Sequence, residues 1–172
     1  MRTTTSDDGS PPGSFEEFYA ANFHGLTLQL YAYTGDLGDA QDLAQEAFCR
    51  ALARWARLGS YDDPVAWVRR VGWNLATSRW RRRRVATSYL RSQREHHVEG
   101  PSPDRIALVR ALSVLPAVQR KIFVQHYVAD MPVLDIARQE GIPEGTVKST
   151  LHRARTALAE QLADLRRESR NV

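Results

Sequence analysis

Residues 130–162 carry two short helical patterns separated by a glycine, and this segment constrains the fold more than any other part of the chain. Gly141 can adopt the positive φ that a sharp turn needs, and Pro143 fits the first turn of a second helix from about Glu144. Before that glycine, helical spacing gives the first pattern an apolar stripe of Val133, Leu134, Ile136 and Ala137. The segment therefore predicts two helices joined by a tight turn.

The second of these helices has two chemically different sides. At about 100° per residue, one side collects the apolar residues Val147, Leu151, Ala154 and Leu158. The opposite side collects Lys148, Ser149, His152, Arg153, Arg155 and Thr156. A lone helix of this kind is usually an amphipathic helix with a solvated cationic face. The short preceding helix and the glycine turn instead favour a helix-turn-helix that reads DNA.

Composition narrows the class of protein. The 172 residues carry a formal net charge of +4, with 24 cationic and 20 anionic residues, so the placement of the charges matters more than their excess. Cys49 is the only cysteine, which excludes an internal disulfide, and no Cys/His set has zinc-finger spacing. The histidines are scattered apart from His96-His97, and no nucleophile or glycine-loop motif accompanies them. We therefore expect no enzyme activity, no cofactor and no bound metal.

The sequence also predicts where the protein acts. No apolar run reaches the roughly 18 residues of a membrane span, and the N-terminus lacks the layout of a signal peptide. We therefore expect a cytoplasmic protein without membrane insertion.

Helical patterns divide the chain into two blocks, which predicts an all-α fold of two small helical domains joined by a flexible linker. The blocks span residues 14–84 and 105–167. Between them, residues 85–104 turn polar and end in Gly-Pro-Ser-Pro, which indicates a tether. Residues 1–13 offer almost nothing to bury and are expected to be a disordered tail, and residues 168–172 form a short C-terminal tail.

The N-terminal block opens on Ser14 and Glu17, which have the spacing of a capping box. Phe15, Phe18, Tyr19 and Phe23 follow as candidate core residues. A second helix from about Asp39 repeats apolar residues at helical spacing, namely Ala40, Leu43, Ala44, Ala47, Phe48, Ala51, Leu52 and Trp55. Its other side presents Asp42, Gln45, Glu46 and Arg50, a row that by itself is most simply solvated surface. Cys49 borders the apolar stripe and is expected to be a small packed residue.

A third helix combines tryptophans with arginines. Trp67, Trp73 and Trp80 lie close in sequence to Tyr61 and to a run of arginines from Arg69 to Arg84. Aromatic rings can stack on unpaired bases, and arginines bind phosphates and aromatic faces, so the combination is typical of single-stranded DNA binding. Trp67 shares an apolar face with Val71, so the sequence does not decide whether Trp67 lies in the core or at the surface.

Four ordered motifs resemble one known family. They read DAQDLAQEAFCRALARW, DDPVAWVRRVGWNLATSRWRRRR, LSVLPAVQRKIF and GIPEGTVKSTLHRARTAL. Together, over about residues 14–162, they are similar to the extracytoplasmic-function (ECF) branch of the bacterial sigma-70 family, and look most like its actinobacterial sigma-E-like group. The resemblance implies a region 2-like domain over 14–84, a region 4-like helix-turn-helix domain over 105–167, and a role in directing core RNA polymerase to promoters.

The resemblance also implies roles for particular residues. It implies that the surface of Asp42, Gln45, Glu46 and Arg50 docks on the β′ clamp helices of core polymerase, while the β flap is a second contact. For the −10 element, where a base is flipped from the non-template strand, it implies Tyr61, Trp67, Arg70, Asn74, Ser78 and Arg81. For the −35 element it implies Thr146, Lys148, Ser149, His152, Arg153 and Arg155. Of these, Lys148, Ser149 and His152 match positions at bases, and Arg153 and Arg155 match positions at the DNA backbone. An anti-sigma factor that covers the polymerase-facing surfaces is implied by family habit alone.

Several positions depart from the family pattern. Thr150 stands where an arginine is frequent, Asp135 where a glutamate is usual, and Ser78 where an Asp or Asn often occurs. The missing arginine at position 150 weakens the case for a full set of phosphate contacts, and Ser78 leaves the −10 preference open. His152 stands in place of an aromatic or apolar residue, which leaves the −35 preference open.

The alternative function is a free-standing helix-turn-helix transcription regulator. Such a regulator would normally carry a ligand pocket or a phosphoacceptor in its first domain. This chain carries a clustered aromatic and arginine helix there instead, followed by a linker. The sequence therefore favours an RNA polymerase sigma factor.

Overall fold

The computed structural model describes residues 14–58, 63–86 and 102–168, and these ranges are helical with no strand. The helices are α1 (Phe15–Thr34), α2 (Leu37–Leu52), α3 (Trp55–Leu58), α4 (Pro64–Ala86), α5 (Pro103–Ser113), α6 (Ala117–Tyr127), α7 (Val133–Glu140) and α8 (Glu144–Glu168). The predicted all-α fold is confirmed. The predicted N-terminal tail, most of the predicted linker and Tyr61 lie outside the described residues, as do residues 169–172 of the predicted C-terminal tail, whose first residue, Glu168, still belongs to α8.

Local sequence signals account for the helix ends of the first half, α1–α4. The Ser14 hydroxyl accepts a bond from the Glu17 backbone N–H at 3.2 Å, and Glu17 accepts one from the Ser14 N–H, which confirms the predicted capping box. Gly35 ends α1 in the left-handed region at φ 76°. Asp36 then caps α2 by accepting a bond from the Asp39 N–H at 2.8 Å.

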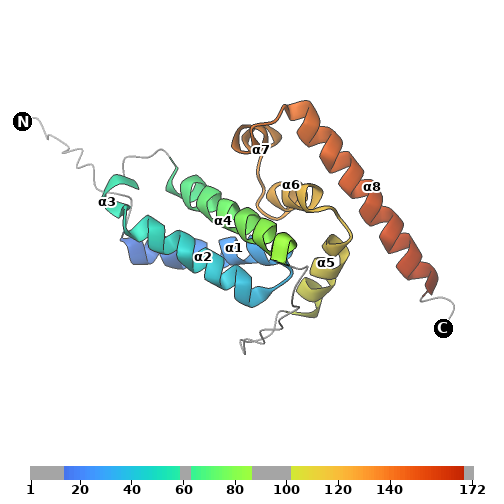
Figure 1. The fold of residues 1–172 in the computed structure, drawn as a ribbon, viewed down its shortest axis with the longest axis horizontal. Helices are drawn as coiled ribbons and strands as arrows, with labels where there is room; N and C mark the ends of the chain where they lie inside the picture. The colour runs from blue at the N-terminus through green and yellow to red at the C-terminus, as the bar shows by residue number, and fades with distance from the viewer. Residues whose placement is uncertain (1–13, 59–62, 87–101, 169–172) are drawn as a thin grey trace, which may run out of the picture.

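The first half packs α1, α2 and α4 side by side (Figure 1). Trp73 and Phe48 are the largest wholly buried side chains of the core. Phe18, Tyr19 and Phe23 of α1 gather around Phe48, with Tyr19 stacked on Phe23 at 4.7 Å between ring centroids, while Phe15 contacts Tyr19 and Trp55. Two predicted core positions are wrong, because Leu52 and Cys49 are exposed at the end of α2.

The second half, α5–α8, builds its helix-turn-helix around a small apolar cluster. The cluster consists of Ile122, Met131, Ile136, Ala137, Val147 and Leu151. Gly141 ends α7 with φ 67° and ψ 35°, and its N–H donates to the Ala137 carbonyl, as the predicted turn requires. Leu134 does not join the buried stripe, because 43% of its surface is exposed. α8 begins at Glu144, so Pro143 lies just before the helix instead of in its first turn.

The two halves share one hydrophobic core. Leu112, Leu115, Val124 and Ala154 of the second half belong to the same buried cluster as Leu30, Phe48 and Trp73 of the first. α5 and α6 both pack on α1 (Figure 1). The chain therefore folds with its two halves in contact, which the sequence patterns did not predict.

Replacing Gly141 with alanine should lower the free energy of unfolding by about 1–2 kcal/mol. The cost comes from the positive φ of 67°, because no other group lies within 4 Å of an added Cβ. Urea unfolding of Gly145→Ala provides the matched control. Gly145 lies in α8 with open space around an added Cβ, so its replacement should not destabilise the protein. Equal losses in both variants would contradict this account of the turn.

Candidate functional site

The N-terminal half of α8 presents one exposed polar face. Its buried side consists of Val147, Thr150, Leu151 and Ala154. All six residues predicted for −35 recognition are exposed on the other side: Thr146, Lys148, Ser149, His152, Arg153 and Arg155. The predicted division of this helix into a packing face and a free face is therefore confirmed.

Contacts within α8 leave these side chains accessible to a ligand. Lys148 Nζ lies 3.8 Å from Glu144 Oε2 one turn earlier, and both side chains are well exposed, so the pair is weak. Ser149 Oγ donates to the Thr146 carbonyl at 3.0 Å, and Arg153 Nε donates to the Ser149 carbonyl at 3.3 Å. These bonds orient the side chains along the helix without burying their charge.

Thr150 lies on the packing side of α8. Only 5% of its surface is exposed, so Thr150 lies away from the exposed face that carries Lys148 and Arg153.

A second candidate surface follows α4. Arg70, Asn74, Ser78 and Arg81 are exposed and recur at three- and four-residue intervals, so they form one strip along the helix. Trp67 is half-buried against the core, with the Arg54 guanidinium carbon 5.9 Å from its ring centroid. Of the other tryptophans, Trp73 is wholly buried and Trp80 is 36% exposed. The strip therefore offers cations, an amide and a hydroxyl group, and Trp67 lies one turn before it on the same helix.

A third candidate surface lies on α2. Asp42, Gln45, Glu46 and Arg50 are all exposed on the side opposite the buried alanines and Phe48. Arg50 Nε donates to Glu46 Oε1 at 2.8 Å, and about half of each side chain is exposed. This surface is polar and carries both signs of charge.

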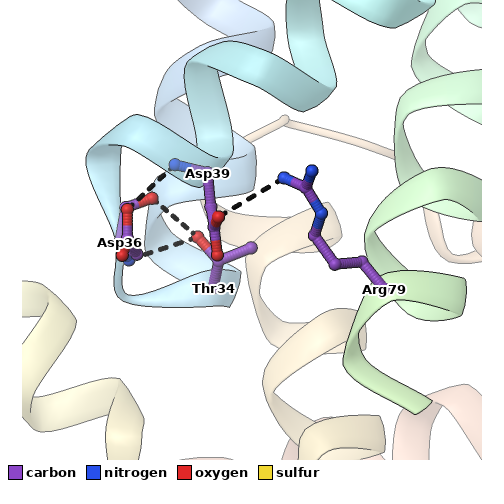
Figure 2. A network of polar contacts seen from close by, with 4 residues as sticks. All are labelled: Thr34, Asp36, Asp39 and Arg79. Atoms are coloured by element: carbon purple, nitrogen blue, oxygen red, sulfur yellow. Dashed lines mark hydrogen bonds and ion pairs between the residues drawn. The ribbon is translucent and has the colours of Figure 1, made fainter. Parts of the chain in front are cut away.

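A polar network fixes the α2 surface relative to the α4 surface (Figure 2). Arg79 Nη1 of α4 lies 3.3 Å from Asp39 Oδ1 in the first turn of α2. The Thr34 hydroxyl donates to the Asp36 carbonyl at 3.1 Å, and Asp36 caps α2. Sequence reasoning missed Arg79, because nothing in an arginine run marks which member turns inward.

Two kinds of site do not occur in the described part of the chain. Residues 14–58, 63–86 and 102–168 contain no group of three or more His, Cys, Asp or Glu side chains that could hold a metal ion. Among these residues no helix is long and apolar enough to cross a membrane.

Comparisons with known proteins bear on all three surfaces. A family model of sigma-70 region 2 matches residues 19–86, which include α2 and α4, and a model of sigma-70 region 4 matches residues 105–158, which include the helix-turn-helix. The RNA polymerase sigma-E factor of Streptomyces antibioticus is 35% identical over 151 residues, which cover 86% of this chain and 84% of that relative. The ECF RNA polymerase sigma factor SigW of Bacillus subtilis is 30% identical over 155 residues, which cover 78% of this chain and 81% of SigW.

The fold is also similar to that of a solved structure. The sigma factor RpoE of Bartonella quintana, in complex with the anti-sigma factor NepR, matches with a TM-score of 0.71 and 25% identity. The match covers 87% of this chain and 96% of RpoE, so it includes both halves. The two family models match in the order region 2 then region 4, and the relatives match over most of their length. Both findings identify the same family. The chain belongs to the extracytoplasmic-function branch of the bacterial sigma-70 family of RNA polymerase sigma factors.

Proposed function

We propose that the exposed face of α8 reads the −35 element of promoters. Thr146, Lys148, Ser149 and His152 would face base edges in the major groove, and Arg153 and Arg155 would bind the DNA backbone. The observation that carries the proposal is the exposure of all six side chains on a helix whose other side is packed in a helix-turn-helix. The proposed helix-turn-helix domain spans residues 105–167.

The strip along α4 is the proposed −10 surface. Asn74 and Ser78 would hydrogen-bond to bases of the non-template strand, while Arg70 and Arg81 would bind its phosphates. Trp67 and Tyr61 would supply ring faces for stacking. Extruding a base costs a few kcal/mol of stacking, which these contacts would have to offset. The proposed region 2-like domain spans residues 14–84.

The polar surface of α2 is the proposed contact with the β′ clamp helices of core polymerase. Asp42, Gln45, Glu46 and Arg50 would make this contact, and the second half would bind the β flap. The sigma factor would act in the cytoplasm, where core polymerase and promoter DNA are found, and would do no bond chemistry itself. Residues 85–104 would link the two domains, with residues 1–13 and 168–172 as tails.

An anti-sigma factor is a further proposed partner. RpoE of Bartonella quintana was solved in complex with an anti-sigma factor, and its fold is similar to that of this chain over both halves. Purification of this chain from its native host should therefore recover an inhibitor with it.

Run-off transcription tests the proposed function. Core polymerase from the host would be supplied with a library of host promoters, with and without this protein, and the 5′ ends sequenced. We expect new transcription start sites that share upstream elements, and these elements would give the −10 and −35 sequences. Duplex binding by the protein alone, without any new start, would favour the free-standing regulator instead.

Two substitutions on α8 should have different effects on binding. Arg153→Ala should weaken binding to every promoter alike and reduce the salt slope by about 1, because a phosphate contact carries no sequence information. Lys148→Ala should relax sequence preference, at a cost of about 1–3 kcal/mol on the preferred promoter. Binding of the holoenzyme to matched and mismatched −35 sites at several salt concentrations would separate the two. Equal losses on all sites for both variants would contradict the assignment.

A further inference from the structure

An ion pair joins the two helices that carry the proposed polymerase and −10 surfaces. Arg79 of α4 reaches across to Asp39 in the first turn of α2, with 3.3 Å between Arg79 Nη1 and Asp39 Oδ1 (Figure 2). The Asp39 side chain is 12% exposed and the Arg79 side chain 35% exposed. The pair is therefore partly shielded from water, where a charged hydrogen bond is stronger than at an open surface.

The pair lies near the C-terminal end of α4. The middle of α4 is anchored in the core by Trp73 and Ala76, which are buried. None of residues 77–82 is buried. The contact of Arg79 with Asp39 thus attaches α4 to α2 at a point where no residue of α4 is buried.

The capping bonds of α2 hold the Asp39 backbone in place. The Asp36 carboxylate accepts a bond from the Asp39 N–H at 2.8 Å. The Thr34 hydroxyl in turn donates to the Asp36 carbonyl at 3.1 Å (Figure 2). Because these bonds fix the first turn of α2, the ion pair ties α4 to a rigid point of α2.

Each partner of the ion pair lies next to residues with a proposed binding role. Asp39 comes one turn before Asp42 of the polymerase surface, and Arg79 lies in sequence between Ser78 and Arg81 of the −10 strip. Asp42, Ser78 and Arg81 are exposed, whereas Asp39 and Arg79 are only partly exposed. The Arg79 side chain points towards α2 (Figure 2), so its guanidinium is not part of the −10 strip.

The spacing between the two surfaces matters for promoter opening. Asn74 and Ser78 would have to meet the flipped base while α2 stays bound to the clamp helices. A binding site works well only when its groups are held within about 0.5 Å of the productive geometry. A shift at the end of α4 would displace Ser78 and Arg81, which lie on either side of Arg79 in the sequence.

We propose that Arg79 and Asp39 are positioning residues for promoter opening, whose ion pair sets the −10 strip at the distance from the polymerase surface that capture of the flipped base requires. The inference rests on the proposed roles of α2 and α4. It gives Arg79 a role unlike that of Arg70 and Arg81, because its charge acts on Asp39 and not on a DNA phosphate.

A phosphate-binding role for Arg79 predicts the opposite result at Asp39. If Arg79 acted only on phosphates, Asp39→Ala would remove a nearby negative charge, leave the guanidinium accessible to DNA and favour opening. If the pair positions α4, Asp39→Ala and Arg79→Ala should both impair opening, although the first raises the net charge and the second lowers it.

The test measures opening by the holoenzyme on a promoter identified by run-off transcription. A 2-aminopurine in the non-template strand of the −10 element becomes fluorescent when its base is unstacked. We expect Asp39→Ala and Arg79→Ala each to slow opening by about three- to tenfold. The double variant should lose no more than either single variant, because the two residues act as one pair. Arg79→Lys keeps a cation opposite Asp39 and should recover part of the rate.

Two controls separate positioning from other effects. Affinity for core polymerase should stay at the wild-type value in both single variants, because the exposed side chains of α2 are unchanged. Urea unfolding then verifies that each variant is folded under the conditions of the assay. Arg82→Ala removes a cation from an exposed position three residues after Arg79. Its effect on opening measures the loss of charge alone and should be smaller than that of Arg79→Ala.

The outcomes separate this inference from the proposed function. Wild-type or faster opening by Asp39→Ala would overturn the positioning role, as would losses that multiply in the double variant. A weaker affinity for core polymerase that accounts for the whole loss would also overturn it. Failure of the wild-type holoenzyme to initiate at any promoter would instead refute the proposed function.

Discussion

Replacing Trp73 with alanine should lower the free energy of unfolding by about 3–5 kcal/mol, because the ring is wholly buried and leaves a cavity that its neighbours fill only in part. The ring meets Tyr33 edge-on, with 5.3 Å between centroids, and lies beneath Lys121 of the second half. The loss would be a large fraction of the 5–15 kcal/mol that usually stabilises a domain. The melting temperature should fall by on the order of 10 °C.

Two variants serve as controls for Trp73→Ala. Trp73→Phe keeps one ring in the core and leaves a smaller cavity, so it should cost less than Trp73→Ala. Trp80→Ala, at the 36% exposed tryptophan of the same helix, should cost less than Trp73→Ala. Urea unfolding followed by circular dichroism measures all three, and a larger loss at Trp80 would contradict the assignment of Trp73 to the core.

Replacing Glu140 with alanine should cost about 2–4 kcal/mol, because two groups with little access to water would lose their partner. Glu140 Oε2 pairs with Lys121 Nζ at 2.8 Å, and Glu140 Oε1 accepts a bond from Gln125 Nε2 at 2.8 Å. The Lys121 and Glu140 side chains are 13% and 18% exposed, and Gln125 is wholly buried. These bonds fix the end of α7 to α6, so the loss should loosen the helix-turn-helix.

A double variant separates the charge from the packing at this site. In Lys121→Met with Glu140→Gln, no charge remains without a partner, and the new amide oxygen can still accept the Gln125 bond. Most of the loss seen in Glu140→Ala should therefore be recovered. Urea unfolding of the single and double variants gives the comparison. A double variant as unstable as Glu140→Ala would show that the stabilisation comes from another property of Glu140.

The helix-turn-helix was the part of the fold that sequence predicted best. Helical periodicity placed Val147, Leu151 and Ala154 inside and Lys148 and Arg153 outside, and the structure confirms these positions. The reason is local, since a short helix that packs on one side exposes the other. The positive φ of Gly141 was also predictable, because glycine has no Cβ and readily adopts this conformation in a tight turn.

The tryptophans of α4 could not be assigned from periodicity alone. α4 packs on α1 and α2, and it also borders the second half, so apolar residues occur on more than one of its sides. Trp73 is buried, Trp67 is half-buried and Trp80 is partly exposed. Cys49 and Leu52 of α2 were predicted to be buried but are exposed, because the buried face of α2 is narrower than the sequence pattern suggested.

The contact between the halves had no signal in the sequence. Arg120 donates to a carbonyl 87 residues earlier in the chain. Every residue has a backbone carbonyl, so the type of residue at position 33 does not reveal this contact. Val109 of α5 likewise lies close to Gly35, which is far from it in the sequence. The roles of the exposed residues on α2, α4 and α8 stay predictions, because exposure permits a contact with polymerase or DNA without identifying it.

The shared core has a consequence for building hybrid proteins. Leu112, Leu115 and Val124 fill space beside residues of the first half, so they are matched to this first half and not only to their own helices. A hybrid that joins residues 14–86 to the second half of a related sigma factor would lose this match. Such a hybrid would have gaps or clashes where the two halves meet, so we expect it to unfold at a lower urea concentration than either parent. Recombining halves between relatives would therefore require matching changes at these core positions, whichever promoters each half reads.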